Sequence, residues 1–151
     1  MFPKLNLPEY QFKIKASEKG GKVQILDITR KKYIVLTPEE WVRQNFIQYL
    51  IGEKKYPASL ISTEAGLKYN QLKKRSDIII YKGASPLVLV ECKAPEIKIS
   101  QKTFDQAAVY NTTLKVKYLI VTNGMNHYCC SMDQQKGTYI FFKEIPAYDE
   151  I

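Results

Sequence analysis

The chain has 151 residues, of which 45% are hydrophobic and 25% charged, and its formal net charge is +8. This is the composition of an ordinary globular domain, and it excludes disordered and fibrous classes. Its apolar runs are far shorter than the roughly 18–20 residues that cross a bilayer, and its start does not resemble a signal peptide. We therefore expect a single soluble, cytoplasmic domain over residues 1–151, without membrane contact.

The cysteines and the histidine limit the metal chemistry. Cys92, Cys129 and Cys130 have no CxxC spacing, and His127 is the one histidine of the sequence. Such a set assembles neither a zinc finger nor a His-based catalytic site. Any metal would be bound by oxygen atoms, which favours ions such as Mg²⁺.

The positive charge is concentrated in the first half of the chain. Residues 1–75 contain 15 basic and 7 acidic residues, whereas residues 76–151 contain 8 of each. This distribution fits a polyanionic partner, and it equally fits lysines that keep a small protein soluble. Charge alone leaves both interpretations open.

The N-terminal third is predicted to be rich in β-structure. Residues 10–16 and 22–28 alternate between apolar and polar side chains around a Gly-containing turn, and residues 31–36 add a third strand. We treat residues 1–36 as a β-rich extension. A core would follow over residues 37–125, and strands and a tail over residues 126–151.

A helix is expected over residues 38–51. Thr37 is placed as its N-cap, with proline at the first helical position and acid in the first turn, and Gly52 is placed at its end. Its apolar positions recur at helical spacing and predict one buried stripe, made of Val42, Phe46, Tyr49 and Leu50.

The remaining segments predict an α/β fold. Two apolar runs flank the turn residues 82–86 and indicate a hairpin, and a helix with Phe104, Ala107, Ala108 and Val109 on one face follows. We expect a sandwich with a central mixed β-sheet flanked by helices. The strands are placed at residues 60–64, 76–81, 86–93, 117–124, 127–132 and 138–142, and the helix at residues 100–111.

Three charged residues interrupt or end apolar strands: Asp77, Glu91 and Lys93. Because strand side chains alternate, Glu91 and Lys93 lie on one face, and the hairpin can bring Asp77 beside them. Two carboxylates form a hard-oxygen site for Mg²⁺. A neighbouring lysine orients or helps to deprotonate water and stabilises charge on a phosphate, which is the equipment for phosphodiester hydrolysis.

A purely structural interpretation stays open for the same residues. Asp77 would then cap a strand, and Glu91 would pair with Lys93 or with a basic neighbour across the sheet edge. A single Glu-x-Lys triplet is short and common, so its context must decide.

That context resembles a known nuclease superfamily. An acid that heads an apolar strand, a turn, and a strand that ends in Glu-Cys-Lys are similar to the PD-(D/E)XK superfamily. Five blocks in family order further resemble the N-terminal nuclease domain of type I restriction enzyme R subunits, and the resemblance spans about residues 35–125. The blocks are TPEEWVRQNFIQYL, KRSDIIIY, PLVLVECKAP, FDQAAVYN and YLIVTNG.

The resemblance implies a role for each matching residue. Asp77 and Glu91 would be ligands of Mg²⁺, with Mn²⁺ as a substitute, and Lys93 the catalytic lysine. Glu40 would be the helical acid that assists the metal site, or alternatively the acid of a capping box. Gln106 would be the polar helix residue near the lysine, or alternatively a solvated position.

The basic stretch Lys73, Lys74 and Arg75 would contact nucleic-acid phosphates near the cleft, or form a solvated charge run. Ser76 stands where the superfamily pattern has proline.

The resemblance as a whole implies a restriction-endonuclease-like fold and a Mg²⁺-dependent DNA endonuclease of a restriction-modification system. A translocating motor or other subunits would be separate chains, and the oligomeric state is left open.

Two alternative functions are kept. The first is a nuclease that acts on RNA or on single-stranded ends, and the second is a nucleic-acid-binding or assembly module that has the fold without cleavage. The presence of Asp77, Glu91 and Lys93 together argues against the second alternative, because a binding module does not need all three.

Overall fold

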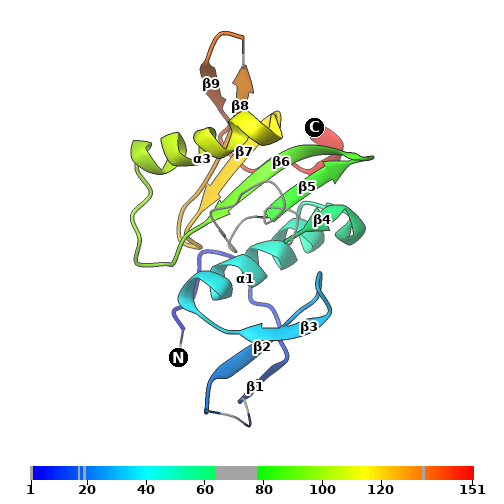
Figure 1. Cartoon of the computed structure of the whole chain (residues 1–151), viewed down its shortest axis with the longest axis vertical. Helices are drawn as coiled ribbons and strands as arrows, with labels where there is room; N and C mark the ends of the chain where they lie inside the picture. The colour runs from blue at the N-terminus through cyan, green and yellow to red at the C-terminus, as the bar shows by residue number, and fades with distance from the viewer. Residues whose placement is uncertain (1, 17, 19, 64–77, 134) are drawn as a thin grey trace.

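The computed structural model describes residues 2–16, 18, 20–63, 78–133 and 135–151, and at 110–114 only the backbone. The fold is α/β, with a mixed six-stranded sheet, two α-helices in the described part and an N-terminal three-stranded sheet (Figure 1). The strands are β1 (Ile14–Ala16), β2 (Val23–Asp27), β3 (Lys32–Val35), β4 (Ile61–Ser62), β5 (Ile78–Lys82), β6 (Ser85–Cys92), β7 (Tyr118–Thr122), β8 (His127–Asp133) and β9 (Thr138–Phe141). The helices are α1 (Pro38–Gly52), α3 (Gln101–Leu114) and the short 3₁₀ turns η1 (Ala58–Leu60) and η2 (Tyr148–Glu150).

The six-stranded sheet has the order β4-β5-β6-β7-β8-β9. Its strands pair antiparallel except for β6 and β7, which are parallel and are joined through α3. A parallel pair needs a crossover connection of a dozen or more residues, and α3 supplies it. The predicted hairpin is confirmed: β5 pairs with β6, and Gly83 takes a positive φ of 61° in the turn between them.

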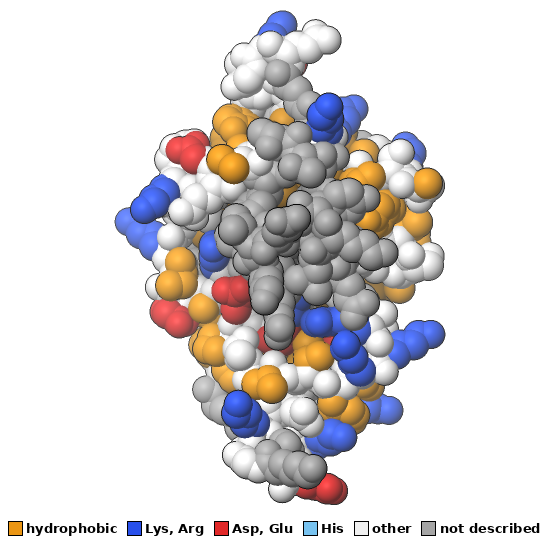
Figure 2. Space-filling model, viewed as in Figure 1, with side chains coloured by type: hydrophobic (Ala, Val, Ile, Leu, Met, Phe, Trp, Pro, Cys, Tyr) orange, Lys and Arg blue, Asp and Glu red, His pale blue; other side chains and the backbone are white. Residues whose placement is uncertain are grey.

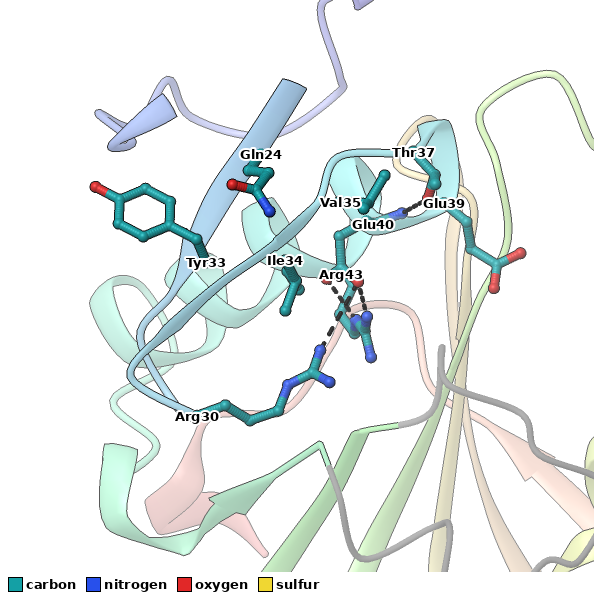
Figure 3. Close-up of a pocket in the computed structure, with 9 residues that line it drawn as sticks. All are labelled: Gln24, Arg30, Tyr33, Ile34, Val35, Thr37, Glu39, Glu40 and Arg43. Atoms are coloured by element: carbon teal, nitrogen blue, oxygen red, sulfur yellow. Dashed lines mark hydrogen bonds and ion pairs between the residues drawn. The ribbon is translucent and has the colours of Figure 1, made fainter. Parts of the chain in front are cut away.

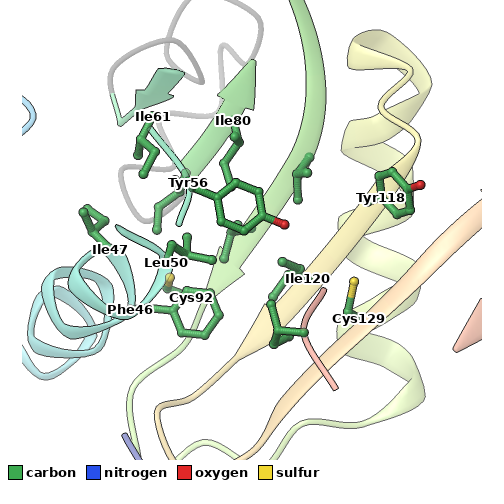
Figure 4. Packing of buried hydrophobic residues seen from close by; sticks show 14 of the residues in the cluster. Phe46, Ile47, Leu50, Tyr56, Ile61, Ile80, Cys92, Tyr118, Ile120 and Cys129 are labelled. Atoms are coloured by element: carbon green, nitrogen blue, oxygen red, sulfur yellow. The ribbon is translucent and has the colours of Figure 1, made fainter. Parts of the chain in front are cut away.

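Two apolar clusters cover the two faces of this sheet. The cluster against α1 contains Phe46 and Leu50 together with even-numbered residues of β6, among them Cys92 (Figure 4). The cluster against α3 contains Phe104 with the odd-numbered Leu89 of β6. Because strand side chains alternate, each residue of β6 is thereby assigned to one of the two layers.

Helix α1 begins and ends close to the predicted positions. The Thr37 hydroxyl accepts a hydrogen bond from the Glu40 amide at 3.0 Å, Pro38 stands in the first turn, and the helix extends through Gly52. Val42, Phe46 and Leu50 are buried as predicted, whereas Tyr49 is half-buried.

The burial of α1 is wider than one stripe. Arg43, Gln44 and Asn45 are buried as well. Their burial follows from the position of α1 between the three-stranded sheet and the six-stranded sheet (Figure 1). A helix covered on two sides must bury polar positions along with its apolar stripe, and these must find partners.

One expectation about burial and one about a strand boundary were wrong. Val109 was placed on the buried face of the second helix, but 67% of it is exposed. The face of α3 that packs on the sheet uses Phe104 and Ala107, which are spaced by three residues, and Val109 falls outside that stripe. The predicted first strand over residues 10–16 is also shorter, since β1 begins at Ile14.

Within the part of the chain that the structure describes, no helix is long and apolar enough to cross a membrane.

Candidate functional site

The C-terminal end of β6 brings together a buried carboxylate and an ammonium group. Glu91 is 1% exposed, and its Oε1 lies 3.3 Å from Nζ of Lys93, whose side chain is 21% exposed. Cys92 between them packs in the α1 layer and Leu89 in the α3 layer, so alternation along the strand puts Glu91 on the α3 side. The ion pair puts Lys93, the residue that follows β6, beside it. The predicted sharing of one face by Glu91 and Lys93 is therefore confirmed.

The backbone around this pair is held by the neighbouring strand. Glu91 is in register with Val121 of β7, and the Lys93 amide donates to the carbonyl of Thr122 at 2.8 Å. The ladder thus continues one residue beyond β6. This pairing fixes where the two side chains leave the sheet, which is the rigidity that a preorganised site requires.

The segment after Lys93 is tied to the end of β7. The side-chain amide of the buried Asn123 donates to the carbonyl of Ile97 at 2.8 Å. Its oxygen accepts from the amides of Met125 and Asn126 and closes the turn between β7 and β8. One side chain therefore connects both loops at this end of the sheet.

Four of the predicted site residues, Asp77, Arg75, Lys74 and Lys73, lie outside the described residues. The described pairing of β5 with β6 ends at Ile78 and Val90. In the described part of the chain no group of three or more His, Cys, Asp or Glu side chains is close enough to hold a metal ion.

Gln106 is exposed on α3. Its solvent-facing position agrees with the interpretation as a solvated helix residue, and its role beside Lys93 stays a prediction.

Glu40 is buried on α1, in the layer on the other side of the sheet, and its carboxylate binds several partners. Oε2 accepts from Nε of Arg43 at 2.8 Å and from Nε2 of Gln44 at 2.9 Å. Oε1 forms ion pairs with Arg43 and, at 3.8 Å, with Arg30 (Figure 3). The Thr37 half of the predicted capping box is present, while the Glu40 carboxylate bonds to these side chains.

The same network continues into the N-terminal sheet. Asp27, which is fully buried, accepts from Nε of Arg30 at 2.7 Å and from the hydroxyl and amide of Thr29. Burial raises the pKa of the Asp27 carboxyl, but the hydrogen bonds from Thr29 and Arg30 outweigh it and hold the pKa below its ordinary value. Asp27 is therefore ionised, and Arg30 bridges two carboxylates.

Arg43 is the most deeply buried cation of this network. Burial lowers the pKa of its guanidinium, and the Cys92 side chain opposes that shift. Sequence reasoning missed Arg43, although it stands three residues after Glu40, a spacing that brings side chains together on a helix. Arg30 stands ten residues before Glu40, between β2 and β3, and no local spacing indicates that the two side chains form an ion pair.

A cleft of about 360 Å³ follows β3 beside this network (Figure 3). Consecutive residues Tyr33, Ile34 and Val35 line one part of it, and Glu40 and Arg43 line another. Glu40 and Arg43 are engaged with each other, and Glu39 of the same helix also lines the cleft.

His127 begins β8, as the sequence predicted, and it has two partners that the sequence did not indicate. Its Nδ1 lies 2.7 Å from the Thr122 hydroxyl and its Nε2 lies 2.9 Å from the carbonyl of Asn6. Burial lowers the pKa of this imidazole, and the bond to Asn6 opposes the shift. His127 thus anchors the N-terminal segment to the end of the sheet.

The comparisons with known proteins agree with this architecture. Residues 38–146 match the family model described as type I restriction enzyme R protein N terminus. No curated protein and no solved structure gives a significant match. The matched range covers most of the chain, begins at the first residue of α1 and includes Glu91 and Lys93, and it indicates a nuclease-like role in a restriction system. The chain belongs to the family of N-terminal domains of type I restriction enzyme R proteins.

Proposed function

We propose that this chain is a Mg²⁺-dependent nuclease domain that hydrolyses phosphodiester bonds of DNA. The observation that carries the proposal is the family match, whose range includes the buried Glu91 carboxylate and the Lys93 ammonium that lies 3.3 Å from it at the end of β6. The ion pair alone also agrees with the structural interpretation of these residues. Family membership supports DNA and other restriction-system subunits as partners. It also favours a PD-(D/E)XK arrangement, in which Asp77 joins Glu91 and Lys93.

The donor chemistry at this end of the sheet fits Mg²⁺. Glu91 offers a carboxylate, which is the hard oxygen ligand that this ion prefers, and Mg²⁺ usually takes one or two protein carboxylates together with water and phosphate oxygens. Asp77 and Glu91 would hold the ion. When bound, Mg²⁺ supplies positive charge that polarises the phosphate and makes the attacking water more acidic.

The residues of the chain would divide the remaining work. Lys93 would orient the attacking water and stabilise the negative charge that grows on the phosphate as the new P–O bond forms and the P–O bond to the leaving sugar oxygen breaks. Asn123 supports this geometry through the loop that follows Lys93. Gln106 would support Lys93 from α3. Glu40, which is bound by Arg43 and Gln44 in the layer across the sheet, is not given a part in the metal site.

The proposal is tested by nicking of supercoiled plasmid with Mg²⁺, Mn²⁺ or EDTA. We expect wild-type protein to cut with either metal and not with EDTA. Glu91→Gln and Asp77→Ala should lose cleavage by about 10³-fold, because each removes a ligand of the ion, and both should still bind DNA through basic residues. Glu144→Gln makes the same chemical change as Glu91→Gln at an exposed carboxylate and should cut like wild type.

Two outcomes would contradict the proposal. Absence of metal-dependent cleavage of any DNA by folded wild-type protein would leave the binding-module interpretation in its place. Cleavage by Glu91→Gln at the wild-type rate would remove the assignment of this residue as a ligand. Substituting RNA or single-stranded DNA for the plasmid in the same assay separates the remaining substrate classes.

A further inference from the structure

The three-stranded sheet is an addition to the part of the chain that matches the family. Its strands lie within residues 14–35, and the match begins at residue 38. One face of the sheet carries Ile25, which is fully buried. The other face carries Lys15, Gln24 and Val35, which lie side by side across the three strands. Lys15 and Val35 are exposed, so this second face is open at its edges.

The exposed charged residues of this sheet are almost all positive. Among the described residues from 13 to 32, five lysines and one glutamate are exposed, and the buried Asp27 is already bound by Arg30. Figure 2 shows Lys and Arg side chains gathered beside the sheet, in the lower right of the view. The exposed charged residues of the range are Lys13, Lys15, Lys22, Lys31, Lys32 and Glu18.

Three of these lysines lie in or directly next to the strands that form the open face. Nζ of Lys15 lies 4.0 Å from the centre of the Tyr33 ring, a cation–π contact that holds the ammonium on this face. Lys13 directly precedes β1, and its carbonyl accepts from the Leu26 amide at 2.9 Å, so the strand pairing continues to it. Because it stands two residues before Lys15, we place its side chain on the same side, about 7 Å away. Lys22 stands two residues before Gln24, the cross-strand partner of Lys15. We call Lys13, Lys15 and Lys22 the lysine face.

We propose that the lysine face binds the phosphate backbone of duplex DNA, an inference that rests on the proposed function because it takes DNA as the substrate. The spacing of about 7 Å between Lys13 and Lys15 equals the axial rise of about two phosphates along one strand, at 3.4 Å each. Lysine contacts to phosphate add affinity and carry no sequence information. The face would hold DNA for the domain without selecting a site.

The test measures how DNA affinity depends on salt. The triple variant Lys13→Gln/Lys15→Gln/Lys22→Gln is compared with wild type by fluorescence anisotropy on a short labelled duplex, in EDTA so that no cleavage occurs. Each phosphate contact contributes about 0.9 to the slope of log K against log salt. The triple variant should therefore have a slope smaller by about 2.7, so that a rise from 50 to 200 mM salt weakens wild-type binding about 40-fold more than variant binding.

A matched control distinguishes loss of the lysine face from a general loss of positive charge. Lys82→Gln/Lys136→Gln/Lys143→Gln removes the same charge from exposed lysines of β5 and of the region around β9, and it should retain the wild-type slope. Circular dichroism and thermal melting establish that all three proteins are folded. An unchanged slope in the first variant, an equal loss in the control, or no DNA binding by wild type would each overturn the inference.

The outcome is distinguishable from a failure of the nuclease proposal. Wild-type protein that binds DNA through the lysine face and never cleaves would contradict the nuclease function and retain the inference. Metal-dependent cleavage together with an unchanged salt slope in the triple variant would support the nuclease function and contradict DNA binding by the lysine face.

Discussion

Glu40 and Glu91 are both buried carboxylates paired with cations, and they lie on opposite sides of the six-stranded sheet. The cations around Glu40 are the guanidinium groups of Arg43 and Arg30, whose side chains are 3% and 12% exposed. The cation beside Glu91 is the ammonium of Lys93, which is 21% exposed. The two carboxylates therefore differ most in the kind of cation and in its access to water.

The kind of cation determines what each pair can do. A guanidinium is planar, remains charged at all ordinary pH values and binds carboxylates with fixed fork geometry, so it holds elements together. An ammonium is a compact point charge on a flexible stem, and it can rotate towards a phosphate or a water. The Glu40 network connects α1 to the N-terminal sheet, whereas the Glu91 pair leaves the Lys93 side chain 21% exposed at the end of β6.

Glu40→Ala should have the largest effect on stability. Removing one partner of a buried ion pair leaves an uncompensated charge and costs about 3–5 kcal/mol. Urea unfolding measures this loss, and Glu39→Ala, in the same helical turn, should cost less than about 1 kcal/mol. Glu40→Gln sharpens the comparison, because a folded variant that has lost metal-dependent cleavage would show that Glu40 also serves the metal site.

Lys93→Ala should affect cleavage more than stability. Deleting one preorganised group that stabilises developing charge typically costs about 10²–10³ in rate. We expect plasmid nicking to fall by this factor. The free energy of unfolding should fall by less than in Glu40→Ala, because water can enter at the partly exposed Lys93 position and solvate the Glu91 carboxylate that is left behind. Lys98→Ala, on the following loop, provides the control. Equal nicking rates for the two variants would place Lys93 outside the chemistry.

The His127 imidazole should make the stability of the protein depend on pH between 5 and 7.5, an effect that neither carboxylate pair provides. Burial lowers the pKa of its imidazole below 6.5, so the folded state binds fewer protons than the unfolded chain at mildly acidic pH. Its contribution to stability is fully present above pH 6.5 and is lost as the pH falls towards the lowered pKa, with a slope of at most about 1.4 kcal/mol per pH unit. Unfolding of wild type and His127→Gln from pH 7.5 to 5 measures it, and parallel curves would contradict the assignment.

The sequence predicted the features that depend on local period. Alternation along β6 placed Glu91 and Lys93 on one face, and the Thr37 cap placed the start of α1. Contacts between distant elements were not predictable in this way. Arg30 reaches Glu40 from the N-terminal sheet, and His127 reaches the carbonyl of Asn6 across 121 positions.

Burial of α1 on a second side was also missed, for a related reason. The spacing of apolar residues predicts which face of a helix is apolar and buried. It gives no sign that a neighbouring polar face is also buried because another sheet covers it. The spacing of Glu40 to Arg43 and Gln44, at three and four residues, was the available signal for that flank.

Gln106 carries the smallest expected effect, and it tests whether the site extends from β6 to α3. The residue is exposed, so Gln106→Ala should change the free energy of unfolding by less than about 0.5 kcal/mol. If its amide donates one hydrogen bond to the reacting groups, nicking should fall by about tenfold, which corresponds to about 1.4 kcal/mol. Gln101→Ala, an exposed residue of the same type on the same helix, controls for general effects on α3. A tenfold fall in Gln106→Ala alone would join α3 to the catalytic end of β6, and identical rates in both variants would leave Gln106 as a solvated helix position.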